Sequence, residues 1–428
     1  MRLLIAALAM ALSAAVQAGV KIEHWLASSG ARVYFVETHV LPILDVEIDF
    51  PAGSAYDPAG KAGLASLTAG LLDAGAGDLD EETISERLAG IGARMGGVTE
   101  GDRAGLTLRT LAYPRERDEA LGLLKLVMTR PTFPDGALAR ERARGIAAIR
   151  EADTRPDAIA AKRFAAAIYP GHPYGVSPAV DSVGSIKRDD LAAFHRNHYS
   201  AARAVVSIIG DVTRAEAEAI AESLTRDLPA GSPETMLPPV SLPAAATVKV
   251  AHPASQSHVH FGLPAVRRGD PDYFPLLVGN YSLGGGGFVS RLMKEVREKR
   301  GYAYSVYSYF APRKLEGPFE IGLQTKREQA ADALKVANEV LAGFMKDGPT
   351  DAELAAAKKN LIDGMALRID SNAKLLGYLS TIGFFGLPLT YLDDFPAKVA
   401  AVTAKDVREA FARRVRAENL VTVIVAGD

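Results

Sequence analysis

A segment near the middle of the chain is repeated at its end, and this repeat limits the possible folds more than any other feature. The residues from Asp189 to Asp211 align without gaps with those from Asp406 to Asp428. Each copy predicts a helix followed by an apolar strand that ends in Gly-Asp. We therefore predict two similar α/β halves. The aligned identical residues are Asp189/Asp406, Ala193/Ala410, Phe194/Phe411, Arg196/Arg413 and Gly210-Asp211/Gly427-Asp428.

A proline-rich segment lies between the two copies. Five prolines fall between Leu228 and Thr247, a composition typical of an interdomain linker. We expect an N-terminal half over residues 19–226, a linker over 227–246 and a C-terminal half over 247–428.

The N-terminus has the pattern of a secretory signal peptide. Met1-Arg2 precede an apolar run that ends in the small-residue pattern Val16-Gln17-Ala18, so we expect a signal over residues 1–18, cleavage after Ala18 and a periplasmic or secreted protein. The run is too short to span a bilayer, which needs about 20 residues. The alternative is a buried N-terminal helix.

Charge and cysteine content exclude several functional classes. The net charge is −2 and the sequence pI is near 6.5, so no overall basic field favours nucleic acid. The absence of cysteine excludes disulfides and thiol chemistry.

The stretch from Leu283 to Thr325 contains the most informative side chains. Gly284–Gly287 precede a predicted amphipathic helix that begins near Val289 and ends at Gly301. A predicted hairpin follows, so Arg297 closes the helix and Tyr304 opens the first strand. One guanidinium and one phenol therefore flank a tight turn. Strict alternation along this strand would place Tyr304, Val306, Ser308 and Phe310 on one face.

The run SRLMKEVREKRGYAYSVYS, residues 290–308, resembles the C-terminal half of the pitrilysin/insulinase (M16) family of zinc metallopeptidases. It is most similar to the bacterial type related to mitochondrial processing peptidase. In that family an Arg and a Tyr seven residues apart contact the substrate at the scissile bond, and the matching residues are Arg297 and Tyr304. Tyr302 departs from the family, which usually has Leu there.

The resemblance covers nearly the whole mature chain and implies its fold. We expect an α+β protein of two similar halves, each a mostly antiparallel sheet with helices on one side. The halves would face each other like a clamshell around a chamber that admits extended or unfolded peptides.

The family's zinc motif H-x-x-E-H is missing from the place where the resemblance puts it. Its three functional positions fall on Ser66, Ala69 and Gly70, and the later glutamate ligand falls on Ala148. None of these residues is a strong zinc ligand or a general base. Glu151 lies nearby but is a single carboxylate. We therefore expect no zinc on this chain.

Other clusters in the sequence offer weaker alternatives. His195 with His198, or His258 with His260, could bind a metal in principle, but surface or hydrogen-bonded histidines are favoured. Gly284–Gly287 are not followed by the Lys-Ser or Lys-Thr of a phosphate-binding loop, and no G-x-S-x-G nucleophile elbow is present.

Two functional hypotheses follow from the resemblance. In the first, the chain is the non-catalytic subunit of a heterodimeric peptidase whose partner, an M16B homologue, carries the zinc. Arg297 would hold a backbone carbonyl or carboxylate of the substrate, Tyr304 would donate to the oxyanion, and Gly285 and Gly286 would let the substrate backbone approach. In the second, the chain is a non-proteolytic scaffold or peptide holder. Arg297 would then be a surface ion-pair partner of Glu295 or Glu298, and Tyr304 a half-buried strand residue. Hydrolysis by this chain alone is disfavoured.

Overall fold

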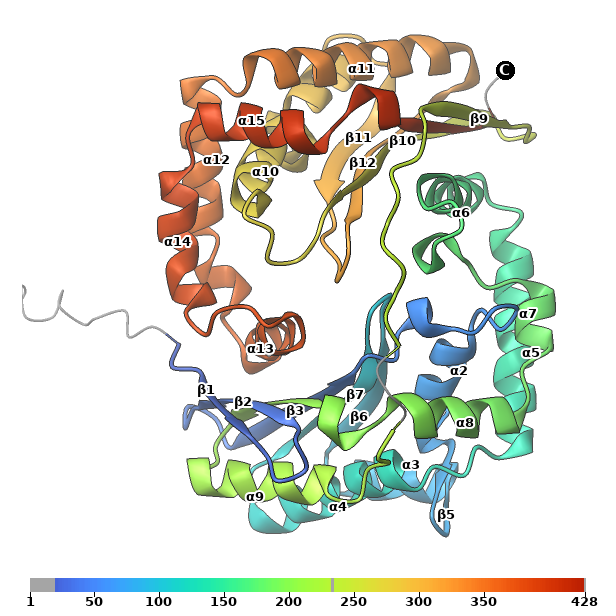
Figure 1. Ribbon diagram of the computed structural model, residues 1–428, viewed down its shortest axis with the longest axis vertical. Helices are drawn as coiled ribbons and strands as arrows, with labels where there is room; N and C mark the ends of the chain where they lie inside the picture. The colour runs from blue at the N-terminus through green and yellow to red at the C-terminus, as the bar shows by residue number, and fades with distance from the viewer. Residues whose placement is uncertain (1–19, 232–234, 427–428) are drawn as a thin grey trace, which may run out of the picture.

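The structure, a computed structural model, describes residues 20–231 and 235–426. The predicted signal peptide (1–18) and the final Gly427-Asp428 of the repeat lie outside these residues. The described chain forms two halves, each built on one large sheet, that face each other (Figure 1). The segment 235–245, which has no helix or strand, leads from the first half to the second (Figure 1).

The N-terminal half contains a six-stranded sheet. Its pairings are antiparallel except for the parallel pair of β2 and β8. In spatial order the strands are β1 (Glu23–Leu26), β2 (Arg32–Glu37), β8 (Val205–Gly210), β3 (Ile43–Phe50), β7 (Ala104–Leu111) and β6 (Arg94–Thr99). A short ribbon joins β4 (Gly75–Ala76) to β5 (Leu79–Asp80).

The C-terminal half repeats this order in a five-stranded sheet. The parallel pair is now β9 with β13, and the other pairings are antiparallel. β9, β13, β10, β12 and β11 thus occupy the places of β2, β8, β3, β7 and β6. The bounds are β9 (Ala246–Val250), β13 (Val421–Val425), β10 (Gln256–Val266), β12 (Gly317–Lys326) and β11 (Ala303–Phe310).

The helices also follow the repeat. α8 precedes β8 and α15 precedes β13, and the aligned Phe194 and Phe411 are both buried. The first half contains α2 (Leu64–Gly70), α3 (Glu81–Gly90), α4 (Pro114–Thr129), α5 (Asp135–Ala152), α6 (Pro156–Ile168), α7 (Val180–Gly184), α8 (Arg188–His198) and α9 (Arg214–Thr225). The second contains α10 (Tyr273–Asn280), α11 (Ala330–Asp347), α12 (Asp351–Asp363), α13 (Asn372–Phe385), α14 (Tyr391–Ala401) and α15 (Ala404–Arg414).

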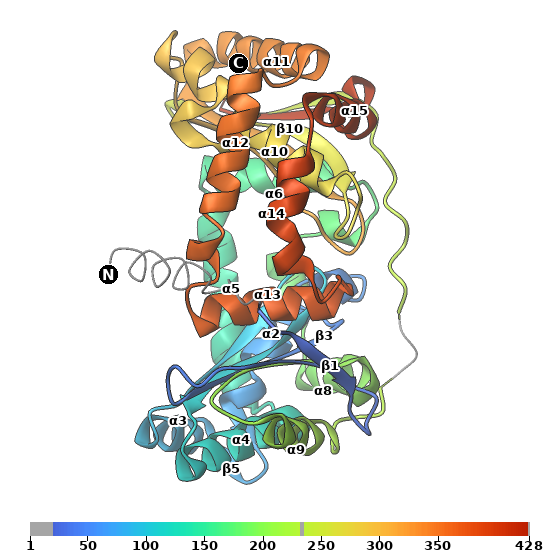
Figure 2. The same cartoon turned by 90° about the vertical axis from the view of Figure 1, so that its left-hand side faces the viewer.

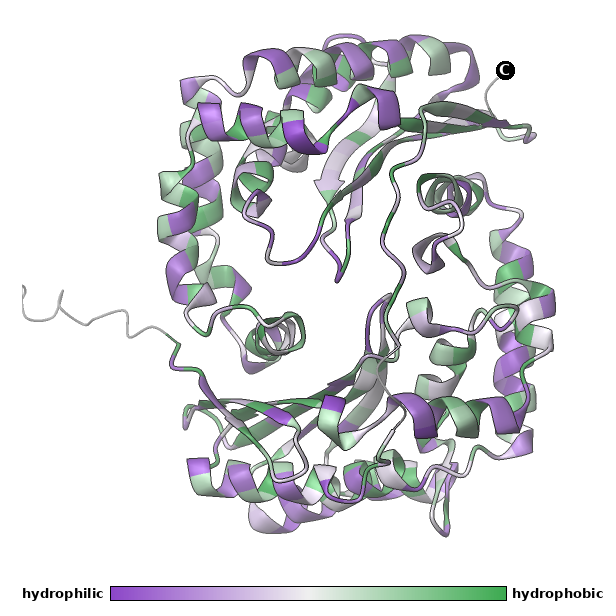
Figure 3. Cartoon of the chain, viewed as in Figure 1, coloured by the Kyte–Doolittle hydropathy of each residue, from purple (hydrophilic) through white to green (hydrophobic). Residues whose placement is uncertain are grey.

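Alternate side chains of β3 pack into the core of the N-terminal half. Leu44, Val46, Ile48 and Phe50 are buried in the core beneath the N-terminal sheet, because successive side chains point to opposite faces. Figure 3 shows hydrophobic green along much of the N-terminal sheet, paler colours on β11, and both colours on the outer helices. The predicted fold class is confirmed: two similar halves, each with a mostly antiparallel sheet.

One helix of each half packs against the sheet of the other half. α13 of the C-terminal half packs on Tyr34 and Val205 of the N-terminal sheet (Figure 2). α6 of the N-terminal half packs on β10 and β13 through residues such as Phe164. Gly383 lets α13 approach closely, because a Cβ there would lie 2.7 Å from Tyr34 and from Val205. This exchange of helices fastens the two halves together.

A buried ionic cluster lies at the same junction. Ser380 of α13 donates to Glu47 (2.9 Å) or Asp49 (2.6 Å) on β3, and Arg103 pairs with Asp49 at 3.3 Å. Burial, together with the neighbouring Asp49 charge, raises the pKa of Glu47 to about 8. Burial likewise raises the pKa of Asp49. With a pKa of about 8, Glu47 is mainly protonated at neutral pH, and the buried guanidinium also pairs with Glu100 at 3.1 Å.

No helix among the described residues is long and apolar enough to cross a membrane.

Candidate functional site

The helix expected to present the zinc ligands is present, but its side chains are unsuitable. On α2, Ser66 and Gly70 are exposed and Ala69 is buried. Ala148 is exposed on α5. These four positions supply one hydroxyl and neither an imidazole nor a carboxylate. Across 20–231 and 235–426, no group of three or more His, Asp or Glu side chains could hold a metal ion.

A carboxylate does lie beside α2, but it serves as a cap. Asp57 accepts hydrogen bonds from the backbone N–H groups of Gly63 and Ala65, both at 2.7 Å. Burial raises its pKa to about 6. Because both oxygens are occupied by the helix N-terminus, Asp57 has a structural role here.

Three of the four histidines in the two pairs, His195, His198 and His260, have hydrogen-bond partners within the chain. His195 contacts the Met128 carbonyl at 2.8 Å, His198 contacts the Pro51 carbonyl at 3.2 Å, and burial lowers the pKa of His195 to about 4. His260 differs, because its Nδ1 lies 2.6 Å from the Glu320 carboxylate on the neighbouring strand. Glu320 is 60 residues from His260 in the sequence, so the histidine spacing alone could not indicate this contact.

Arg297 and Tyr304 lie together, and a third residue joins them. The guanidinium carbon of Arg297 is 4.8 Å from the ring centroid of Tyr304 and 4.8 Å from that of Phe288. Both contacts are cation–π interactions. The sequence analysis missed Phe288, although an aromatic residue directly after a glycine run was a usable signal.

Tyr304 does not join the buried face of its strand, contrary to the alternation predicted above. Ala303 pairs with Thr325 and Ser305 pairs with Gln324, so Tyr304 is the extra residue of a β-bulge. Its side chain is 80% exposed, whereas Val306 and Ser308 are buried. The bulge thus turns the phenol out of the sheet toward Arg297.

The charge of Arg297 is available to a ligand. Glu295, one of its possible ion-pair partners, is bound instead by Lys299 at 2.6 Å and Arg300 at 2.8 Å. Within the described parts of the chain, Arg297 makes no ion pair. Aromatic faces therefore orient this guanidinium without neutralising it.

The predicted helix and glycine loop differ from expectation in their backbone geometry. Leu292, Met293 and Val296 are buried as predicted, but the backbone forms a π-helical turn, η7 (Met293–Glu298). The glycines begin in a second π-helical turn, η5 (Tyr281–Gly285), and not in an open loop. A Cβ on Gly284 would lie 2.6 Å from the Ser308 backbone nitrogen, so close packing explains that glycine. Gly285 is exposed and Gly286 is half-buried; their predicted contact with substrate stays a prediction.

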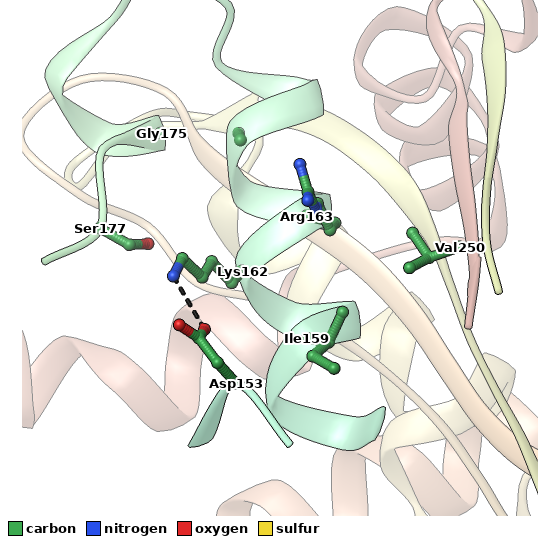
Figure 4. A pocket seen from close by; sticks show the side chains of 8 residues that line it. Asp153, Ile159, Lys162, Arg163, Gly175, Ser177 and Val250 are labelled. Carbon is green, nitrogen blue, oxygen red and sulfur yellow. Dashed lines mark hydrogen bonds and ion pairs between the residues drawn. The ribbon is translucent and has the colours of Figure 1, made fainter. Parts of the chain in front are cut away.

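A separate cavity of about 460 Å³ opens where α6 meets β9 (Figure 4). Lys162 and Asp153 form an ion pair at 3.0 Å on its wall, and Val250 of β9 lines it from the other half. The cavity therefore belongs to the junction of the halves and not to the Arg297 cluster.

Comparisons with known proteins agree with this architecture. Residues 32–179 match the family described as Insulinase (Peptidase family M16), and residues 185–361 match the Peptidase M16 inactive domain. A crystal structure titled peptidase M16 inactive domain, from Pseudomonas fluorescens, is 36% identical with a TM-score of 0.90. The match covers 95% of this chain and 98% of that chain.

Two curated relatives show the range of the family. The non-peptidase homolog YmxG of Helicobacter pylori is 25% identical over 92% of this chain and 91% of its own length. The uncharacterized zinc protease SCO5738 of Streptomyces coelicolor is 32% identical over 54% of this chain, and the match spans about half (51%) of that relative. The chain therefore belongs to peptidase family M16, as an inactive member that lacks the zinc motif of the family's peptidases.

Proposed function

We propose that this chain is the zinc-free subunit of a heterodimeric M16B peptidase and supplies substrate-binding groups to a zinc-bearing partner. The observation that carries the proposal is the arrangement of Arg297 between the Phe288 and Tyr304 rings. Glu295 and Glu298 are close to Arg297 in the sequence, yet among the described residues its guanidinium contacts two aromatic rings and makes no ion pair, so its charge stays available to a substrate oxygen.

The two side chains offer complementary chemistry to a peptide. The Arg297 guanidinium presents several N–H donors in a plane, which suits a carbonyl or carboxylate oxygen. The phenol of Tyr304, 80% exposed on its bulge, can donate to an oxygen that becomes negative as a tetrahedral intermediate forms. One donor of this kind contributes about 3–4 kcal/mol to transition-state stabilisation. The attacking water would be activated on the partner.

The proposed setting is the periplasm or the exterior of the cell. The N-terminal pattern with expected cleavage after Ala18 supports it. Extended or unfolded peptides are the proposed substrates, and the partner is an M16B homologue with an intact H-x-x-E-H motif.

Reconstitution tests this function. The mature chain alone should not hydrolyse peptide with zinc added, whereas an equimolar mixture with a zinc-bearing homologue from the same organism should. Arg297→Ala and Tyr304→Phe should each lower turnover of the mixture about 10²- to 10³-fold while size-exclusion chromatography shows unchanged assembly. Arg300→Ala is the matched control, because that arginine is paired with Glu295. Unchanged turnover in both site variants would favour the scaffold function.

A further inference from the structure

Two more tyrosines lie beyond Tyr304 on β11, which is an edge strand of its sheet. Tyr307 and Tyr309 point to the same face, their ring centroids are 6.0 Å apart and their planes differ by 11°. They remain 37% and 38% exposed. The strand therefore presents a flat aromatic surface, which we call the tyrosine platform.

Contacts beneath the platform fix both rings. Tyr309 donates to Glu320 at 2.6 Å, and the other oxygen of that carboxylate lies 2.6 Å from His260. Tyr307 lies over Gly322, where a Cβ would come within 2.8 Å of its ring. The rings are thus ordered before any ligand arrives, which lowers the entropy cost of binding.

The platform presents no free carboxylate, although one lies below it. Both oxygens of Glu320 are occupied, and the residue is only 7% exposed. Burial, with a contribution from Glu320, raises the pKa of Tyr307 to about 12, and the same causes raise the pKa of Tyr309. Both phenols are therefore uncharged at neutral pH.

The neighbouring charges indicate the kind of side chain that fits. The negative faces of the rings and the Glu320 carboxylate below them disfavour an acidic group. Phe288 and Val289, exposed by 63% and 53%, extend the apolar surface near Arg297.

We propose that the tyrosine platform is a specificity subsite that binds an aromatic or large aliphatic side chain of the peptide. This inference rests on the proposed function, because Arg297 and Tyr304 would hold the same peptide. Tyr307 is the third residue after Tyr304, a span of about 10 Å along an extended chain. The recognised side chain should therefore lie about three residues from the scissile bond.

Equilibrium binding to the mature chain alone tests the subsite. Fluorescein-labelled peptides of one neutral sequence would carry Phe, Leu, Ala, Lys or Glu at one position, and fluorescence anisotropy would give each Kd. We expect Phe to bind about 3- to 10-fold more tightly than Ala, the range typical of an aromatic pair. Tyr307→Ala should abolish this ratio, and Tyr309→Phe, which keeps the ring, should retain most of it.

Tyr113→Ala is the matched control, since Tyr113 is an exposed tyrosine (55%) on the N-terminal half. Circular dichroism would verify that each variant is folded. Equal binding of the Phe and Ala peptides, tighter binding of the Lys peptide, or a ratio that survives in Tyr307→Ala would each overturn the subsite and leave the proposed function standing. Failure to bind any peptide would overturn the subsite together with the substrate-holding role of the chain.

Discussion

The guanidinium carbon of Arg297 lies 4.8 Å from the ring centroid of Tyr304. Tyr304 is the extra residue of a β-bulge, which turns its side chain out of the sheet. The two side chains come from different elements, η7 and β11, joined by a tight turn at Gly301. Their relation depends on three local features: the second aromatic face of Phe288, the left-handed glycine in the turn, and the bulge. Two of these features can be removed separately.

Phe288→Ala should weaken the site without touching either proposed donor. The variant removes one of two aromatic faces on Arg297, and a partly exposed cation–π contact contributes about 0.5–1 kcal/mol. We expect kcat/KM of the reconstituted heterodimer to fall about two- to fivefold. Val289→Ala, which alters the adjacent exposed residue, should have a smaller effect. Equal losses in both variants would show that general apolar contact matters and orientation of Arg297 does not.

Gly301 should be required for its backbone conformation alone. Its φ is +63°, and a Cβ there would meet nothing within 4 Å. Gly301→Ala should therefore destabilise the fold by about 1 kcal/mol through left-handed strain. Gly301→Asn should lower the stability less than Gly301→Ala does, because asparagine adopts the left-handed conformation more readily. Thermal unfolding would measure both, and an alanine variant as stable as the wild type would contradict this explanation.

Two glycines of α13 provide a matched pair at the junction of the halves. Gly383→Ala should destabilise the protein by about 1–3 kcal/mol, because the new Cβ would overpack against Tyr34 and Val205. Gly377→Ala, on the same helix, meets nothing within 4 Å and should stabilise by up to about 1 kcal/mol. Urea unfolding would give both values. The same sign for both changes would show that helix propensity, and not close packing, decides the outcome.

The buried cluster predicts a pH dependence of stability. The pKa of Glu47 is raised in the folded state from 4.5 to about 8, so the native state holds a proton that the unfolded state releases. Its contribution to stability is fully present below pH 4.5 and is lost as pH rises through 8. Glu47→Gln, which imitates the protonated acid, should remove this loss.

The change in Tm between pH 5 and pH 9 would measure this effect in both proteins. Between pH 5 and pH 9, the Tm of the wild type should fall further than the Tm of Glu47→Gln. Asp49, Arg103 and the half-exposed Glu100 surround the same site, so Asp49→Asn would show how far the second carboxylate contributes. Parallel Tm profiles for wild type and Glu47→Gln would refute the assignment to Glu47.

Local patterns predicted much of the fold and part of the site. The repeat predicted two similar halves because helix and strand periods are local properties, and α8–β8 and α15–β13 occupy matching places. The seven-residue spacing likewise predicted that Arg297 and Tyr304 lie close together, as they do. What they do for a peptide is still a proposal.

Features that depend on distant contacts or on one extra residue were not predictable. A period of two along β11 could not reveal the bulge at Tyr304. Ser380 meets Glu47 across 333 residues of sequence, so the alternating acids of β3 gave no sign of α13 covering them. The role of Glu320 beneath the tyrosine platform was not predictable for the same reason. Its partners His260 and Tyr309 lie on two neighbouring strands, and only the folded sheet brings them to it.

Titration of a zinc-bearing homologue with this chain tests the central claim most directly. With the homologue at fixed concentration, peptide turnover should rise until one equivalent of the chain is present and then stay constant. Metal analysis should find one zinc per heterodimer and none in the chain alone. Turnover by the isolated chain that a chelator abolishes, together with a stoichiometric zinc ion bound to it, would contradict the account.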